Sequence, residues 1–145
     1  MAIHARDVVP FTQARARLSE LAEEVKGAEA PYIIDTRQIL EWEAGHVAGA
    51  HFIPFYEVAD RLGDIPRDRP VYVYCGSGYR AAAVTSLLQH EGFDNVVLVD
   101  DMFGNAAAAG FAIESTPAPE REPGWTWIAS RAAVRSHSER SGAHA

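Results

Sequence analysis

The sequence predicts an α/β domain over about residues 5–113, with a central parallel sheet of four or five short strands flanked by helices. The chain has 145 residues, a length that suits one compact domain with a core of its own. Residues 71–99 have the pattern of a strand, a glycine-rich turn, a helix and a second strand. Because such βαβ units build parallel sheets, this segment sets the fold class.

The first half of the chain predicts short elements. We expect a weak edge strand at 5–9, then a helix that Thr12 caps and whose apolar residues keep helical spacing as far as Val25. The other elements expected before residue 70 are strands at 32–35 and 51–53, a helical turn at 38–43 and a short helix at 55–62.

The βαβ unit has the clearest signals. Val71 to Tyr74 are β-branched or aromatic, which favours a strand. Residues 75–78 form a turn with two glycines, and residues 79–90 are rich in Ala and Leu at helical spacing until Gly92. Residues 96–99 predict the next strand, which ends at two aspartates.

Residues 114–145 have a different composition, and we expect them to form a flexible C-terminal extension. The extension is rich in proline, and its end is rich in Ser, Gly, His and charge. Trp125 and Trp127 interrupt it. We favour a structure in which these rings fold back onto the domain, and a patch that docks a partner is the alternative.

The composition excludes several classes of function. With 13 basic and 20 acidic residues, the formal net charge of −7 disfavours nucleic acid as a partner. No run approaches the ~20 apolar residues of a membrane span, and residues 1–6 lack the apolar part of a secretory signal. A single cysteine excludes an internal disulfide framework and Cys-cluster zinc sites. We therefore expect a cytoplasmic domain with one thiol.

That thiol, Cys75, lies where the predicted strand passes into the predicted helix. Ligands of parallel sheets bind at the carboxyl ends of the strands. Gly76 and Gly78 permit positive φ, so backbone N–H groups can turn inward, and the helix N-terminus adds its own N–H groups and dipole. Arg80 adds a fixed positive charge, and residues 71–90 contain no Asp or Glu. We expect this environment to favour the thiolate of Cys75.

Each of these features also has an ordinary structural explanation. A lone cysteine after a strand is often a small core residue, two glycines can serve a tight turn, and an arginine can be a solvated surface charge. The combination in one loop favours a nucleophilic thiol. Protein tyrosine phosphatases place five residues between Cys and Arg, but here four separate Cys75 from Arg80 and residue 81 is alanine. A phosphatase is therefore the less favoured alternative.

Three segments together resemble the rhodanese (sulfurtransferase) family over about residues 7–113. Residues 34–37 (Ile-Asp-Thr-Arg) resemble its Asp-x-Arg motif. Residues 41–50, followed by Ile-Pro at 53–54, are similar to its Glu-aromatic-x-x-Gly-His-Ile-x-Gly-Ala segment. Residues 73–80 resemble its active-site loop, with Cys75 at the persulfide position.

The resemblance implies a two-step sulfur transfer with no metal or organic cofactor. Cys75 would take a sulfane sulfur from thiosulfate or a thiol persulfide and pass it to cyanide, a thiol or a partner protein's cysteine in a sulfur relay. The residues that would bind the substrate are Gly76, Ser77, Gly78, Tyr79 and Arg80. Those with supporting roles in the surrounding loops are Asp35, Arg37, Glu41 and His46. A non-catalytic sulfur carrier or regulatory module is the main alternative.

Two departures from the family pattern bear on the substrate. The loop lacks the second cation that many members use to hold thiosulfate, and Asp100-Asp101 follow the fifth strand where the family usually has two glycines. Similar loops with a downstream Asp-Asp pair occur in rhodanese domains attached to persulfide dioxygenases. A low-molecular-weight persulfide, or thiosulfate made from one, is therefore a candidate donor. His46 and His51 without a third ligand give weak evidence for a metal.

Overall fold

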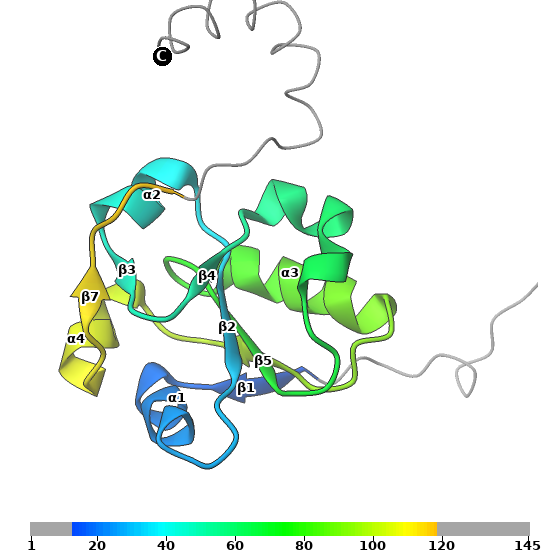
Figure 1. The fold of residues 1–145 in the computed structure, drawn as a ribbon, viewed down its shortest axis with the longest axis horizontal. Helices are drawn as coiled ribbons and strands as arrows, with labels where there is room; N and C mark the ends of the chain where they lie inside the picture. The colour runs from blue at the N-terminus through cyan, green and yellow to red at the C-terminus, as the bar shows by residue number, and fades with distance from the viewer. Residues whose placement is uncertain (1–12, 119–145) are drawn as a thin grey trace, which may run out of the picture.

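Five parallel strands form the central sheet of the computed structural model, which describes residues 13–118 (Figure 1). Their spatial order is β1-β6-β5-β2-β4, and each pairs with its neighbour in parallel. The sheet confirms the predicted fold class. The strands are β1 (Ala14–Ala16), β2 (Tyr32–Asp35), β4 (His51–Phe52), β5 (Val71–Tyr74) and β6 (Val96–Val99).

Helices cover both faces of this sheet. On one face lie α1 (Leu18–Val25) and α4 (Ala106–Ala109), and on the other lie α3 (Tyr79–His90) and the 3₁₀ helices η2 (Phe55–Asp60) and η3 (Leu62–Asp64) (Figure 1). The shorter elements α2 (Ile39–Ala44) and η4 (Phe103–Asn105) follow strands β2 and β6. None of the helices in residues 13–118 is long and apolar enough to cross a membrane.

The central strands β5 and β6 are apolar on both faces, and each face of the sheet has its own buried cluster. Val73 and Ile34 pack with α3, whereas Tyr74 and Ile33 pack with α1 and α4. This alternation follows from the two-residue period of a strand. Near-continuous apolar strands such as β5 and β6 are typical of parallel sheets that helices cover on both sides.

The βαβ unit has the residue ranges that the sequence predicts. Strand β5, helix α3 and strand β6 begin and end at the expected residues, and Gly92, with φ of +93°, follows the helix end. Strand β2 is also as predicted. The predicted helix at 55–62 is instead two 3₁₀ helices, η2 and η3, with Gly63 inside the second.

The N-terminal prediction is wrong for the residues that are described. Residues predicted to begin a helix form the edge strand β1, in which Ala14 pairs with Val97 of β6, and α1 begins at Leu18. Helix propensity gives way to this pairing because one helical turn gains little alone. Glu20 accepts a hydrogen bond from the Arg17 N–H, which starts the helix at that point. The strand expected at 5–9 and Thr12 lie outside the described residues.

A second, two-stranded sheet has no counterpart in the sequence prediction. Strand β3 (His46–Val47) pairs antiparallel with β7 (Ile113–Glu114). Beyond β7, the Ser115 hydroxyl donates to the Glu43 carbonyl and the Ala118 N–H donates to the Glu43 carboxylate. Contacts with the domain thus continue past residue 113. Trp125, Trp127 and the rest of the predicted extension beyond residue 118 lie outside the described residues.

Candidate active site

The Cys75 loop connects the carboxyl end of β5 to the first residue of α3. Cys75 has a side chain that is only 1% exposed, and it packs in the cluster that includes Ile34, Val73 and Ala81. It is the single cysteine of the chain and a free thiol. The sulfur therefore lies at the edge of the core, where the loop begins.

Two backbone N–H groups point at the sulfur. Gly78 donates to Cys75 Sγ at 3.0 Å and Ala81 donates at 3.3 Å. Gly78 has φ of +95°, a left-handed conformation that glycine adopts without strain, and it precedes the first turn of α3. The helix N-terminus thus directs N–H groups and its dipole towards the sulfur. Ala81 is a contact that the sequence analysis did not name.

The other four predicted substrate-binding residues surround this point. Ser77 and Tyr79 are exposed, Tyr79 to 86%, whereas Gly76 and Arg80 are partly buried. Gly76 is not in the left-handed region that the sequence analysis allowed for it. A Cβ there would lie 3.2 Å from Nη2 of Arg80, a tight contact that would require the guanidinium to shift.

Arg80 forms a two-pronged ion pair with Glu41 of α2. Its Nη1 and Nη2 donate to the two carboxylate oxygens at 2.7 and 3.0 Å. The hydrogen bond from Arg80 lowers the pKa of Glu41 to about 2, and the same bond raises the pKa of Arg80. The absence of acids in residues 71–90 therefore does not leave Arg80 uncompensated, because Glu41 reaches it from another element.

A buried hydrogen-bond network lies at the carboxyl ends of β2 and β5, on the face of the sheet that α1 and α4 cover. Asp35 accepts hydrogen bonds from Nε and Nη2 of Arg37 and, at 2.7 Å, from the Tyr74 hydroxyl. Arg37 also donates to the Gly45 carbonyl at 2.6 Å, and Val47 N–H donates to the Tyr74 oxygen at 3.0 Å. Burial raises the pKa of Tyr74, which remains a neutral donor. The network joins β2, β5 and the segment around β3.

Phe103 connects this network to the Cys75 loop. Its N–H donates to the Gly76 carbonyl at 2.8 Å, and its ring lies 4.0 Å from the guanidinium carbon of Arg37. The same ring stacks on Tyr74. Phe103 thus restrains the loop from the side of β6, a contact that the sequence analysis did not anticipate.

The two aspartates after β6 have different roles. Asp100 lies beside the loop, because a Cβ on Gly78 would be 3.3 Å from its Oδ1, and it pairs with Arg15 at 2.9 Å. Asp101 accepts backbone hydrogen bonds from Leu18 and Met102. Its carboxylate therefore holds the start of α1 and the segment after β6. Of the two carboxylates, only that of Asp100 is placed at the loop.

The two histidines are held in separate places. His46 is buried, its Nδ1–H donates to the Trp42 carbonyl at 2.8 Å, and its ring stacks on the Trp42 ring. His51 stacks on Tyr32, and burial lowers its pKa. Within residues 13–118 no three His, Cys, Asp or Glu side chains are grouped to hold a metal ion.

Thr36 is an unsatisfied polar group next to Cys75. Its N–H donates to the Tyr74 carbonyl, so it follows the β2–β5 pairing and lies opposite Cys75 in the register. The side chain is fully buried, and its hydroxyl has no hydrogen-bond partner among residues 13–118. Such a group is costly in a core.

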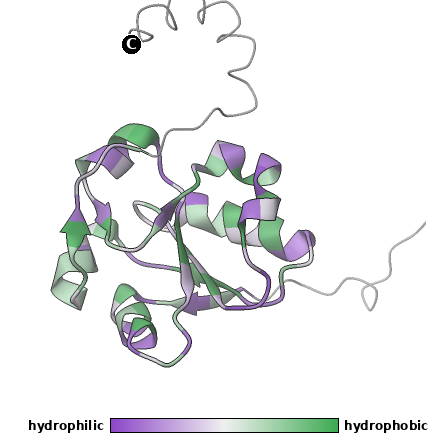
Figure 2. Cartoon of the chain, in the orientation of Figure 1, coloured by the Kyte–Doolittle hydropathy of each residue, from purple (hydrophilic) through white to green (hydrophobic). Residues whose placement is uncertain are grey.

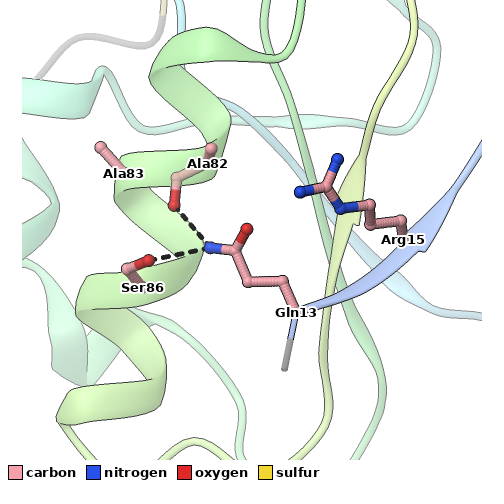
Figure 3. Close-up of a pocket in the computed structure, with 5 residues that line it drawn as sticks. All are labelled: Gln13, Arg15, Ala82, Ala83 and Ser86. Atoms are coloured by element: carbon pink, nitrogen blue, oxygen red, sulfur yellow. Dashed lines mark hydrogen bonds between the residues drawn. The ribbon is translucent and has the colours of Figure 1, made fainter. Parts of the chain in front are cut away.

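A shallow hollow of about 420 Å³ lies between α3 and the β1 segment (Figure 3). Gln13 reaches across it and donates to the Ala82 carbonyl and the Ser86 hydroxyl. Arg15 and Ala83 also line it. The loop residues 75–79 are not part of its lining, so the hollow is separate from the sulfur.

Known proteins share part of the sequence and the fold of this chain. Residues 17–104 match the model of the Rhodanese-like domain. The thiosulfate sulfurtransferase GlpE of Pseudomonas entomophila is 32% identical over 76 residues, 52% of this chain and 70% of GlpE. The putative sulfur carrier protein YrkF of Bacillus subtilis is 30% identical over 82 residues, 57% of this chain but only 44% of YrkF.

A solved structure shows the same fold. The rhodanese-related protein from Thermoplasma volcanium superposes with a TM-score of 0.63 at 25% identity, covering 71% of this chain and 99% of that one. The aligned part spans about half or less of the length of several curated relatives. Whole-protein properties of such relatives do not transfer directly.

Proposed function

The chain belongs to the rhodanese-like domain family, and from this premise we propose that it is a sulfurtransferase that works through a persulfide on Cys75. The observation that supports this most is the direction of two N–H groups, from Gly78 and Ala81, onto the sulfur at the N-terminus of α3. A thiolate is the nucleophilic form of cysteine, and this environment stabilises negative charge on sulfur.

The reaction has two substitutions at sulfur. The Cys75 thiolate attacks the outer sulfur of the donor, a new S–S bond forms, and the electron pair of the broken S–S bond leaves on the donor's inner sulfur. An acceptor thiolate or cyanide then attacks the outer sulfur of the Cys75 persulfide, and the thiolate of Cys75 returns. No electrons are gained or lost overall. The backbone N–H groups of the loop stabilise the charge in both steps.

A thiol persulfide is our preferred donor over thiosulfate. Arg80, Arg37 and Arg15 are each paired with a carboxylate. A dianion such as thiosulfate gains less from compensated cations than from free ones. The loop's resemblance to rhodanese domains attached to persulfide dioxygenases supports the same preference. We also propose a cytoplasmic location, where the free thiol stays reduced.

The direct test is the mass of the protein after exposure to a donor. Glutathione persulfide should add about 32 Da, one sulfur atom, and the addition should reverse with cyanide. Cys75→Ser should gain nothing under the same conditions. If no donor adds this mass to the wild-type protein, or if the serine variant transfers sulfur equally well, the proposal is wrong.

The relative named a putative sulfur carrier supports a second candidate, a module that holds sulfur without turnover. The low exposure of Cys75, 1%, is compatible with such a store. Steady-state assays separate the two functions. An enzyme releases many equivalents of thiocyanate per protein when donor and cyanide are both in excess, whereas a carrier loads once and releases sulfur slowly.

A further inference from the structure

Exposed large apolar side chains gather around the Cys75 loop. Apart from Val25 and Ile113, all those in residues 13–118 lie on α2, on η2, at the start of α3 or after β6. Figure 2 shows the strongly hydrophobic segment of α2 at the upper edge of the molecule. We call this group the apolar rim; it consists of Ile39, Leu40, Phe55, Tyr56, Tyr79 and Met102.

Hydrogen bonds attach two segments of the rim to the site. Leu40 is next to Glu41, whose carboxylate holds Arg80. Met102 is next to Phe103, whose N–H donates to the Gly76 carbonyl at 2.8 Å. Both apolar side chains therefore sit on segments that are fixed to the loop.

The same holds for the remaining segments. Phe55 N–H donates at 3.0 Å to the carbonyl of Thr36, which lies opposite Cys75 across the β2–β5 pairing. The Phe55 and Tyr56 rings meet edge to face. Tyr79 belongs to the loop–helix junction itself and is 86% exposed. The rim residues thus lie on segments that adjoin the loop.

Exposure of this extent needs an explanation. Leu40 is 75% exposed and Met102 is 57% exposed. Single apolar side chains on a surface are ordinary, but a group of them around one site marks an interaction surface. Aromatic residues and Met are the types enriched where proteins bind each other.

The charges near the rim also favour a protein as the partner. Arg80 is neutralised by Glu41 and Arg15 by Asp100. A small anionic acceptor finds compensated charges there, whereas an apolar surface of a protein loses no favourable hydration by covering the rim. Because Cys75 is 1% exposed, an acceptor that reaches its sulfur has to contact the surface around the loop.

From these observations we infer that the apolar rim docks an acceptor protein that presents a cysteine flanked by apolar residues. This inference rests on the proposed function, because it needs the Cys75 persulfide. The acceptor thiolate attacks the outer sulfur of that persulfide. The S–S bond between this sulfur and Cys75 Sγ breaks, its electron pair stays on Sγ as the thiolate, and the acceptor becomes the persulfide. The apolar flanks bury the rim while the thiol enters at the loop.

Paired peptides test the inference with the full-length protein. The protein is first loaded with glutathione persulfide and freed of excess donor. It is then mixed with peptides of about ten residues that carry one central cysteine, flanked in one by Leu and Phe and in the other by Ser and Glu; an interface anchored by apolar residues should make the first accept sulfur about tenfold faster. The loss of about 32 Da from the protein is the readout.

Rim variants make the test specific. Leu40→Glu and Met102→Glu should remove most of the preference for the apolar peptide, whereas Val25→Glu, which puts the same charge at an exposed apolar position outside the rim, should keep it. Transfer to cyanide should stay within about twofold in all three variants, because cyanide is too small to use the rim.

The outcomes separate this inference from the proposed function. Equal rates for the two peptides, or a preference that survives both rim variants, overturns the docking surface while sulfur loading and transfer to cyanide still stand. A protein that never takes up sulfur overturns the proposed function and with it this inference.

Discussion

Two arginine–carboxylate pairs flank the end of strand β5, and they differ in burial. Arg37 and Asp35 are almost fully buried, with side chains 5% and 0% exposed. Arg80 and Glu41 are partly exposed, at 27% and 39%. A buried pair is costly to break because one charge stays without a partner, whereas an exposed pair contributes little to stability. The first pair therefore holds the fold, and the second controls the charge at the loop.

The difference also shows in what else each pair contacts. Arg37 reaches the Gly45 carbonyl and the Phe103 ring, so its loss affects several segments. Arg80 touches the loop, where a Cβ on Gly76 would approach its Nη2. The predictions below separate stability from sulfur transfer, from the largest expected effect to the smallest.

Arg37→Met should cost the most stability. The substitution leaves Asp35 buried without its ion pair, and breaking such a pair typically costs about 3–5 kcal/mol in unfolding free energy. Urea unfolding measures the change. Lys26→Met is the matched control, because Lys26 and Glu23 are 70% and 73% exposed and their loss should change stability by less than about 0.5 kcal/mol. Similar losses in the two variants would contradict the contrast between buried and exposed pairs.

Arg80→Met should affect the rate of sulfur loading much more than stability. We expect stability to fall by no more than about 1 kcal/mol, since the ion pair is partly exposed. Loading of Cys75 by glutathione persulfide should slow by about tenfold, because Glu41 without its partner places an uncompensated negative charge beside the loop. The rate is measured by quenching the loading reaction at several times and determining the fraction of persulfide by intact mass. A rate equal to wild type would show that Arg80 takes no part in loading.

Thr36→Val should raise stability by about 1 kcal/mol. Valine has nearly the same shape but no hydroxyl, and a buried hydroxyl without a partner carries a desolvation cost that valine avoids. Urea unfolding again gives the change. Thr85→Val is the control, because the Thr85 hydroxyl donates to the Ala82 carbonyl and its removal should lower stability instead. A loss of stability in Thr36→Val would mean that its hydroxyl has a partner in solution.

The parts that were predictable from sequence are those that local patterns determine. β5, α3 and β6 have continuous apolar or Ala- and Leu-rich residues between glycine turns, so their limits could be read directly. Strand β1 could not, because Ala14–Ala16 becomes a strand only through pairing with β6. The two-stranded sheet of β3 and β7 likewise depends on residues that are far apart in the chain.

The site follows the same rule. The Cys75 loop was predictable because its glycines, thiol and arginine are consecutive. The pairing of Arg80 with Glu41 was not, since 39 positions separate them and only the fold brings them together. For the same reason, the N–H of Phe103 and the apolar rim could not be inferred from spacing.

The smallest expected effect is the contribution of Glu41 to stability as the pH falls. Arg80 holds the pKa of Glu41 at about 2, below its ordinary value of 4.5, so the unfolded chain binds the proton at higher pH than the folded one. The stabilisation is complete above about pH 4.5 and is lost as the pH falls towards 2. Because the Glu41 side chain is 39% exposed, solvent screening should keep the contribution below about 1 kcal/mol.

A comparison of variants at two pH values measures this contribution. Glu41→Gln should be less stable than wild type in urea at about pH 6, and the difference should shrink at about pH 3, where Glu41 of the unfolded wild-type chain takes up a proton. Glu23→Gln, which alters an exposed carboxylate on α1, is the control for general acid effects. A difference that stays constant between the two pH values would show that the ion pair does not stabilise the folded state. The partly exposed pair would then act only on the charge at the loop, and the contrast with the buried pair would become sharper.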